Sequence, residues 1–193
     1  MDEPTDLSSL QRINFLMEFN MKNINIIGLL LLVISLTLSA QTIKDYIRND
    51  WPDNRYTVHG DGTVTDNKTN LMWKVCSEGQ TWSSPATCSG TATRHNWQQA
   101  LELADSAIYP LISGFNDWRL PNIAELRSLV AKDRSYPTIN LTVFPNTPTN
   151  YFWSSSPNAS SSDDARIVYF YEGRGGYSLR YATGRVRLVR AGQ

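Results

Sequence analysis

Arginine and tyrosine side chains gather at the end of the chain. The arginines are Arg166, Arg174, Arg180, Arg185, Arg187 and Arg190, and the tyrosines among them are Tyr169, Tyr171, Tyr177 and Tyr181. Guanidinium groups bind sulfate and carboxylate through paired hydrogen bonds, while tyrosine rings stack on sugar faces and their hydroxyls form hydrogen bonds. This combination predicts a surface that binds a glycan, with anionic or sulfated groups as one option.

A smaller set of these residues is predicted to contact the ligand. The set is Arg174, Tyr177, Arg180, Tyr181, Asp163 and Asp164. The glycine-rich segment 173–176 predicts a turn that presents the first of them, whereas the two acids could instead hold a cation or a neutral sugar. A structural use competes with both, because alternation along a strand sends about half of the side chains inward or into cross-strand pairs.

Cys76 and Cys88 are the two cysteines of the chain. In an oxidising compartment, a pair that closes a short loop is predicted to form a disulfide. A metal site is the weaker alternative, because two cysteines without nearby histidines cannot complete a tetrahedral set. Asp61 and Asp66 offer oxygen ligands for calcium, but turn chemistry explains both more simply, so no metal and no cofactor is assigned.

Recognisable catalytic motifs are missing from the sequence. It contains no Gly-x-Ser-x-Gly, no His-Glu-x-x-His and no glycine-rich phosphate loop. His95 could act as an acid or base, but no nucleophile lies near it in the sequence. We therefore assign no catalytic residue and predict that the protein is not an enzyme, with a hydrolase as the least favoured reading.

The first forty residues are predicted to lie outside the folded domain and to include a targeting segment. Lys22 and the apolar run 26–38, followed by Ala40, have the form of a signal peptide over residues 21–40. Residues 1–20 are too acidic for a leader and are predicted to be a start-site artefact or a disordered extension. The protein is thus expected to be secreted, periplasmic or on the cell surface, and to meet a membrane only through this export signal, with an uncleaved anchor as the alternative.

The charge balance beyond this leader argues against a nucleic-acid partner. Two of the 18 basic and four of the 18 acidic residues lie in the first forty, which leaves 16 basic and 14 acidic residues and a net charge of about +2. A net charge this small does not provide the strongly basic surface that binds the phosphate backbone of a nucleic acid. An extracellular glycan or a surface protein remains as the predicted partner.

The stretch 114–126 is predicted to organise the fold. Asn122 and Glu125 form a capping box, and Pro121 suits the first turn of the helix that it starts. Trp118 is predicted to anchor the core, and Arg119 on the opposite side is predicted to form an internal salt bridge or hydrogen bonds to loop carbonyls.

Short elements surround this stretch. Residues 56–75 alternate β-branched runs with Gly, Asp and Asn turns and predict a three-stranded meander, preceded by a linker or strap over 41–54. A second helix is predicted from Asn96, with a capping box to Gln99. After a proline-broken crossing over 133–148, strands are predicted at 151–156, 165–171, 177–181 and 184–190. The order predicts an α+β domain with a mostly antiparallel sheet.

The chain resembles a bacterial family of exported domains typified by the C-terminal domain of the Legionella collagen-like adhesin (DUF1566). The matching pieces are the segments 61–66, 71–73, 117–122, 152–155 and 186–190, together with Cys76, Gly79, Cys88, Trp97, Ala100, Leu101, Glu125 and Leu126. They run in order through the predicted domain 55–193. Trp153 lies in one of these pieces and is assigned a structural role with Trp118, Arg119, Pro121 and Glu125.

The resemblance implies a C-type-lectin-like fold. It implies two short helices beside a small sheet, N- and C-terminal strands that pair (56–58 near 186–188), and a ligand face built from loops of the second half. The calcium-binding Glu-Pro-Asn loop of sugar-binding lectins is replaced here by Ser156-Pro157-Asn158, so calcium-dependent sugar binding does not follow. The function implied is an adhesin-like binding module. The alternative is an envelope assembly component that meets a protein through Trp51, Trp82, Tyr151 and Phe152.

Overall fold

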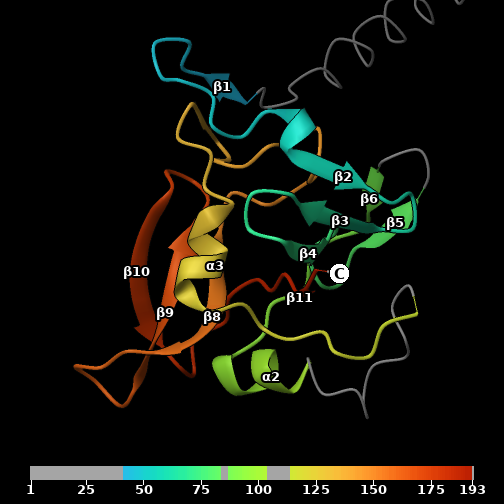
Figure 1. Ribbon diagram of the computed structural model, residues 1–193. Coiled ribbons are helices and arrows are strands. Elements are labelled where there is room, and N and C mark those ends of the chain that lie inside the picture. The colour runs from blue at the N-terminus through green and yellow to red at the C-terminus, as the bar shows by residue number, and fades with distance from the viewer. Residues whose placement is uncertain (1–40, 84–86, 104–113, 193) are drawn as a thin grey trace, which may run out of the picture. The chain divides into compact units, whose positions relative to one another are not determined.

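The computed structural model describes residues 41–83, 87–103 and 114–192. The predicted extension 1–20 and signal peptide 21–40 lie outside these residues. The described part has a mixed α+β fold in which two short helices accompany antiparallel strand pairs, as predicted (Figure 1). Within the same residues, no helix combines the length and apolarity that a membrane span requires.

One sheet contains the predicted meander. Its strands are β2 (Tyr56–Val58), β3 (Thr63–Asp66), β4 (Leu71–Lys74) and β11 (Val189–Ala191), in the order β11-β4-β3-β2. The first and last strands therefore share a sheet, but β2 pairs with β3 and β11 pairs with β4. The predicted direct pairing of residues 56–58 with 186–188 is wrong in this detail, because the meander places β2 at the far edge and leaves only the β4 edge open.

A second sheet carries the candidate ligand residues. It consists of β8 (Tyr151–Pro157), β9 (Asp164–Tyr169) and β10 (Arg174–Leu179), in the order β10-β9-β8. The β9–β10 turn lies at 170–173 rather than at the predicted 173–176. Gly173 has φ of 79°, and a Cβ at this position would lie 2.7 Å from Val130 Cγ1, so the turn requires glycine here. Arg174, Gly175 and Gly176 belong to the strand.

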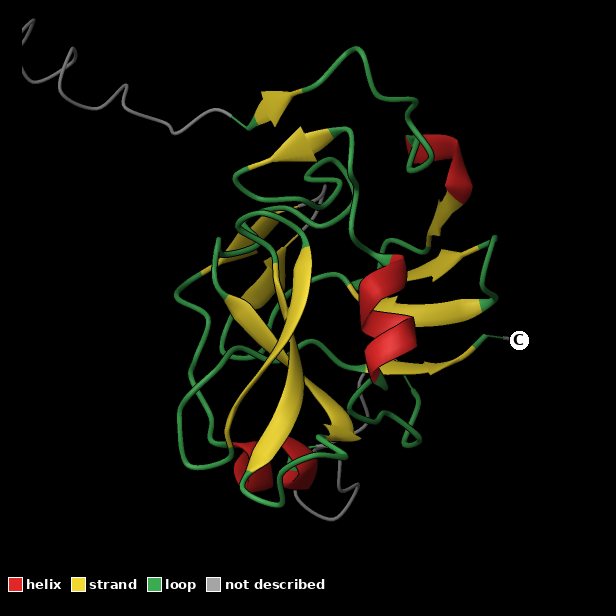
Figure 2. Ribbon diagram, turned by 90° about the vertical axis from the view of Figure 1, so that its left-hand side faces the viewer, coloured by secondary structure: helices red, strands yellow, loops and turns green. Residues whose placement is uncertain are grey.

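The two helices begin where the capping boxes predicted. Helix α2 spans Trp97–Glu102 and helix α3 spans Ile123–Ser128. Asn96 Oδ1 accepts a hydrogen bond from the Gln99 N–H at 2.9 Å, and Asn122 Oδ1 accepts one from the Glu125 N–H at 2.9 Å. Helix α3 packs against β8 and β9, as Figure 2 shows from the side.

The segment 41–54 is held against the domain by several contacts. It contains β1 (Thr42–Ile43), which pairs with β7 (Arg134–Ser135), and it leads into the 3₁₀ turn Asp53–Arg55. The Trp51 indole N–H donates to the Ser128 carbonyl at 2.8 Å, and the Gln41 amide donates to the Ile139 carbonyl at 2.7 Å. Of the two readings of this segment, these contacts favour a strap over a linker.

The predicted disulfide is confirmed. Cys76 and Cys88 are joined with an S–S distance of 2.05 Å and a Cα–Cα distance of 5.4 Å. Cys88 belongs to β6 (Thr87–Ser89), which forms a small hairpin with β5 (Thr81–Ser83). Both sulfur-bearing side chains are buried in the core, so the bond fixes the hairpin to the body of the domain.

Residues 184–191, the closing segment, connect the two sheets. Near its start, the Arg185 N–H donates to the Tyr151 carbonyl and the Arg185 carbonyl accepts from the Trp153 N–H, both at 3.0 Å. Near its end, Val189 pairs with Trp73 of β4 on one side and with Arg119 on the other. Only residues 189–191 form a strand, and both sides of the segment are buried. The predicted final strand over 184–190 is therefore confirmed only at its end, and its expected single apolar face is wrong, because the segment runs through the core.

Candidate functional site

The β9–β10 hairpin places the candidate ligand residues along an edge strand. Paired positions run from Arg174 opposite Tyr169 to Leu179 opposite Asp164. Strand β10 is the outermost strand of its sheet in the described structure, as Figure 1 shows. The hairpin therefore presents one whole strand to the surroundings.

Three apolar side chains are exposed on or just after β10. Tyr177 is 65% exposed, Leu179 is 41% exposed and Tyr181, just beyond the strand, is 76% exposed. Tyr177 and Leu179 share one side of the strand, since their positions alternate with Gly176 and Ser178. Large apolar side chains in such positions, close together and held by a rigid sheet, are typical of a contact surface.

Arg180 is held in place by three contacts at one end of the hairpin. Its guanidinium carbon lies 4.3 Å from the centroid of the Trp97 ring, and its Nε donates to the Asp164 carbonyl at 3.3 Å. Its backbone N–H donates to the Asp163 carbonyl at 2.8 Å. The structure thus brings Arg180, Asp163 and Asp164 together, with Tyr181 next along the chain, where the sequence analysis treated the acids as an alternative to the arginines.

Arg174 lies at the other end of the strand. Six residues of extended chain separate it from Arg180, which corresponds to about 20 Å. Its guanidinium carbon lies 4.9 Å from the Tyr169 ring centroid, and it forms an ion pair with Glu172. A ligand that contacts both arginines must therefore span the length of β10.

Several arginines of the predicted basic face are buried instead. Arg187 is fully buried and Arg190 is 6% exposed, while Arg166 and Arg185 are half-buried. Arg190 Nε donates to Asp117 Oδ1 at 2.6 Å, and its guanidinium carbon lies 3.9 Å from the Phe115 ring centroid. The predicted concentration of arginines on one face is thus wrong, because the closing segment takes its arginines into the core.

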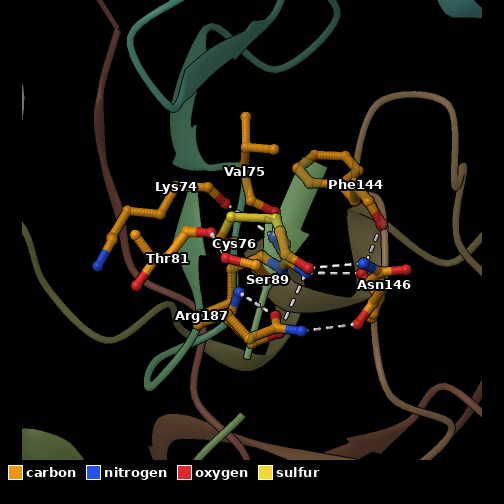
Figure 3. Close-up of a disulfide and its surroundings, with 12 residues drawn as sticks. Lys74, Val75, Cys76, Thr81, Ser89, Phe144, Asn146 and Arg187 are labelled. Atoms are coloured by element: carbon orange, nitrogen blue, oxygen red, sulfur yellow. Dashed lines mark hydrogen bonds between the residues drawn. A yellow bond between two sulfur atoms is a disulfide. The ribbon is translucent and has the colours of Figure 1, made fainter. Parts of the chain in front are cut away.

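Arg187 joins the disulfide region to the long crossing (Figure 3). Its guanidinium donates to the carbonyls of Lys74 (2.8 Å) and Val75 and to Thr147 Oγ1 (2.7 Å), and it lies 4.8 Å from the Phe144 ring centroid. Burial lowers the pKa of Arg187 to about 9, so the side chain still carries its charge at neutral pH. This arginine stabilises the interior and is not available to a ligand.

The residues assigned to structure lie inside or beside the core. Trp118 is 6% exposed and Trp153 is fully buried, and Pro121 is also buried. Arg119 donates to both carboxylate oxygens of Glu125, at 2.7 and 2.6 Å. Hydrogen bonds from Arg119 lower the pKa of the Glu125 carboxyl. The same carboxylate accepts from the Asn122 N–H at 2.8 Å, so one side chain caps α3 and fixes the preceding turn.

The acidic residues of the first half have structural partners. Asp61 Oδ1 accepts from the Thr63 N–H at 2.9 Å and from Thr63 Oγ1 at 2.6 Å. Asp66 is buried and receives two hydrogen bonds from Arg55, at 2.7 and 2.5 Å. Among the residues that the structure describes, no group of three His, Cys, Asp or Glu side chains is arranged to hold a metal ion.

His95 lies beside a small cavity of about 210 Å³ that Gln99, Glu102 and Leu103 also line. Its Nε2 is 2.7 Å from Thr93 Oγ1, and burial lowers the pKa of the imidazole. Glu102 supplies the one carboxylate of this described lining, and it accepts a hydrogen bond from the Gln98 amide at 2.9 Å rather than from His95. This histidine can accept or donate a hydrogen bond, but we assign it no catalytic role.

Trp97 and Leu179 contribute to the site, and sequence reasoning did not assign them to it. Trp97 is the first residue of α2, and its indole N–H donates to the Ser154 carbonyl at 2.8 Å. Its ring also supports Arg180. The spacing along the sequence carries no signal for this contact, because 83 positions separate the two residues.

These features define a class of protein: a small, disulfide-bonded α+β module with an exposed aromatic edge strand. Residues 62–190 match the model of the Lcl C-terminal domain family, and the chain belongs to that family. This family is a module associated with adhesins and is not known to be catalytic. No curated protein gives a significant match to the chain. The disulfide is consistent with an exported protein.

Proposed function

We propose that this protein is a secreted or surface-bound, adhesin-like module that binds a glycan along β10. The observation that carries the proposal is the exposure of Tyr177 and Tyr181 on and beside a rigid edge strand. Tyrosine rings stack on the apolar faces of sugar rings, and their hydroxyls supply directional hydrogen bonds. The membership of an adhesin-associated family supports the same reading.

The polar groups around these rings suit a ligand with hydroxyl and acidic groups. Arg180 is oriented by the Trp97 ring at 4.3 Å and is partly exposed. Asp163 is exposed beside it and can accept hydrogen bonds from sugar hydroxyls. Arg174, at the other end, lies where a second acidic group of an extended polymer would reach. The proposed ligand is therefore a polysaccharide segment rather than a single sugar.

Because few arginines are exposed, the proposal gives the tyrosines the larger share of the binding energy. Ion pairs at an exposed surface contribute little and weaken with salt, whereas ring stacking does not. Raised salt should therefore weaken binding to sulfated glycans only partly. The proposed site consists of tyrosine rings and arginine side chains, so the proposed glycan binding does not require calcium.

A glycan array with the full chain, recovered after export, tests the proposal. Tyr177→Ala and Tyr181→Ala should each weaken binding about tenfold, the loss expected for one stacking contact. Tyr46→Ala is the matched control, because Tyr46 is also highly exposed, at 81%, but lies in the strap. Binding that survives both β10 changes, or that disappears with EDTA, would contradict the proposal. Silence across the array, with a surface protein captured by crosslinking, would favour the assembly role.

The four aromatic side chains on which that assembly role was based make contacts within the domain. Phe152 is fully buried, and Trp82 is partly buried against the core. The Trp51 indole is engaged with the Ser128 carbonyl, and the Tyr151 hydroxyl donates to the Thr183 carbonyl at 2.8 Å. Phe152 is therefore not available to a partner, and the observations favour the glycan over the assembly role.

A further inference from the structure

Among the residues that the structure describes, no strand pairs with the outer edge of β10. The Arg180 N–H donates to the Asp163 carbonyl, which fixes the alternation of the β9–β10 ladder. In an antiparallel pair, every second residue directs its N–H and C=O to the neighbouring strand, and the residues between direct them away. The groups of Gly175 and Tyr177 therefore point outward from the sheet.

Other strand edges of the described structure are blunted, but this one is not. Strand β8 carries a bulge between Trp153 and Pro157, and Phe152 pairs with Arg185 of the closing segment. Strands β2 and β11 at the edges of the other sheet are only three residues long. Strand β10 is six residues long and contains no proline, no lysine and no register shift. An open edge of this kind is a template for another strand.

We propose that β10 pairs with β10 of a second copy of this chain, antiparallel about a two-fold axis at Gly176. In this register Gly175 of each copy lies opposite Tyr177 of the other, and their outward-facing groups form the hydrogen bonds. An isologous edge contact of this type closes after two copies. It joins the two three-stranded sheets into one.

The side chains select this register over its neighbours. It places each Tyr177 ring over a glycine, where no side chain competes for the space. The methylene groups of Arg127 lie beside Gly175, where a Cβ would be 3.8 Å from Arg127 Cδ, so the incoming ring also meets an arginine stem. Glu172, in the turn just before β10, comes near Arg180 of the other copy, so opposite charges meet at both ends of the contact.

The adjacent registers are less favourable. Moving the axis to Tyr177 sets the two large rings against each other and sets Arg174 opposite Arg180, which brings like charges together. Moving it to Gly175 sets Arg180 opposite Phe170, which is fully buried and cannot receive it. The charge pattern of the edge is therefore complementary to itself in one register.

This inference does not depend on glycan binding, and because both contacts use Tyr177 and Arg180, dimerisation and glycan binding along β10 would compete. It is tested without ligand by sedimentation velocity of the full chain over a range of concentrations. The fraction of dimer should rise with concentration for the unchanged protein. Gly175→Pro, which removes one outward N–H, and Tyr177→Lys should each weaken dimerisation at least about tenfold.

Control variants separate this contact from general effects. Val58→Lys changes an exposed residue, 53% exposed, on the edge strand of the other sheet and should leave the dimer unchanged. Glu172→Arg and Arg180→Glu should each weaken the dimer, and the double variant should restore it, because the charges are exchanged. Circular dichroism confirms that each variant is folded. A monomer at all concentrations, or a dimer that both β10 edge changes leave intact, would overturn the inference.

Discussion

The closing segment and the β9–β10 hairpin use the same residue type in opposite ways. In the closing segment, Arg187 is fully buried and its guanidinium is surrounded by carbonyl and hydroxyl oxygens. In the hairpin, Arg174 is largely exposed and pairs with a neighbouring glutamate. An arginine-rich sequence therefore need not form a basic surface. The path of the backbone through the core decides which charged side chains a ligand can reach.

The largest effect is expected when Arg187 is replaced. Arg187→Ala removes every guanidinium hydrogen bond, leaves the Lys74 and Val75 carbonyls without this donor, and opens a cavity next to Phe144. We expect a loss of about 4 kcal/mol or more in the free energy of unfolding. Chemical denaturation followed by circular dichroism measures it. A loss below about 1 kcal/mol would show that the interior does not depend on this arginine.

Removing the disulfide should have the next largest effect. Replacing both Cys76 and Cys88 with serine frees a loop whose ends are 12 residues apart in sequence. The expected loss is about 3 kcal/mol, because the unfolded chain regains the entropy that the bond removed. Comparing the thermal midpoint with and without a reductant provides an independent measurement on the unchanged protein. A midpoint that a reductant leaves unaltered, with free thiols verified, would contradict this expectation.

A buried ion pair in the first half of the chain, between Arg55 and Asp66, should make the stability of the domain depend on pH. Burial alone would raise the pKa of Asp66, but hydrogen bonds from Arg55, Thr69 and the Lys68 N–H outweigh it and lower the pKa. A lowered pKa contributes stability that is present above the unfolded pKa of about 4 and is lost as the pH falls through the folded value.

Asp66→Asn should therefore cost about 2 kcal/mol at pH 7 and make the loss of stability below pH 4 less steep. Denaturant titrations at pH 7 and at several acidic values measure both effects. Asp163→Asn, a change of the same kind at an exposed position, controls for the loss of a negative charge. Equal acid sensitivity in the unchanged protein and in Asp66→Asn would rule out this role for the pair.

The smallest effect is expected at the exposed arginine. Arg174→Ala removes an ion pair whose side chains are 68% and 50% exposed, and such pairs contribute at most about 0.5 kcal/mol. The free energy of unfolding should stay within that range while glycan binding weakens. Here a loss of stability as large as that for Arg187 would remove the distinction between the two regions.

Local signals in the sequence were sufficient for the elements that start or close locally. Asn122 and Glu125 mark the start of α3 because a capping box involves only four consecutive residues. The meander and the cysteine pair were likewise predictable, since their partners lie within about a dozen residues. The family resemblance indicated that these pieces belong to one domain, and residues 62–190 match the family model.

Features that depend on distant partners could not be predicted in this way. The burial of Arg187 is decided by Lys74 and Thr147, which come from other parts of the chain. The β9–β10 turn was misplaced because three glycines compete for it, and only the contact with Val130 selects Gly173. Trp97 beside Arg180 is a third case. Each concerns a side chain whose neighbour is determined by tertiary packing rather than by spacing.

The closing segment also sets the order in which the protein can mature. Residues 184–191 supply the outer partner of β4 and the backbone neighbour of β8, so neither sheet is complete until they emerge from the ribosome. A nascent chain that lacks them has two unfinished edges and no buried Arg187. Folding of the described domain should therefore wait for these residues, and a variant truncated before Gly184 should lack both completed sheets.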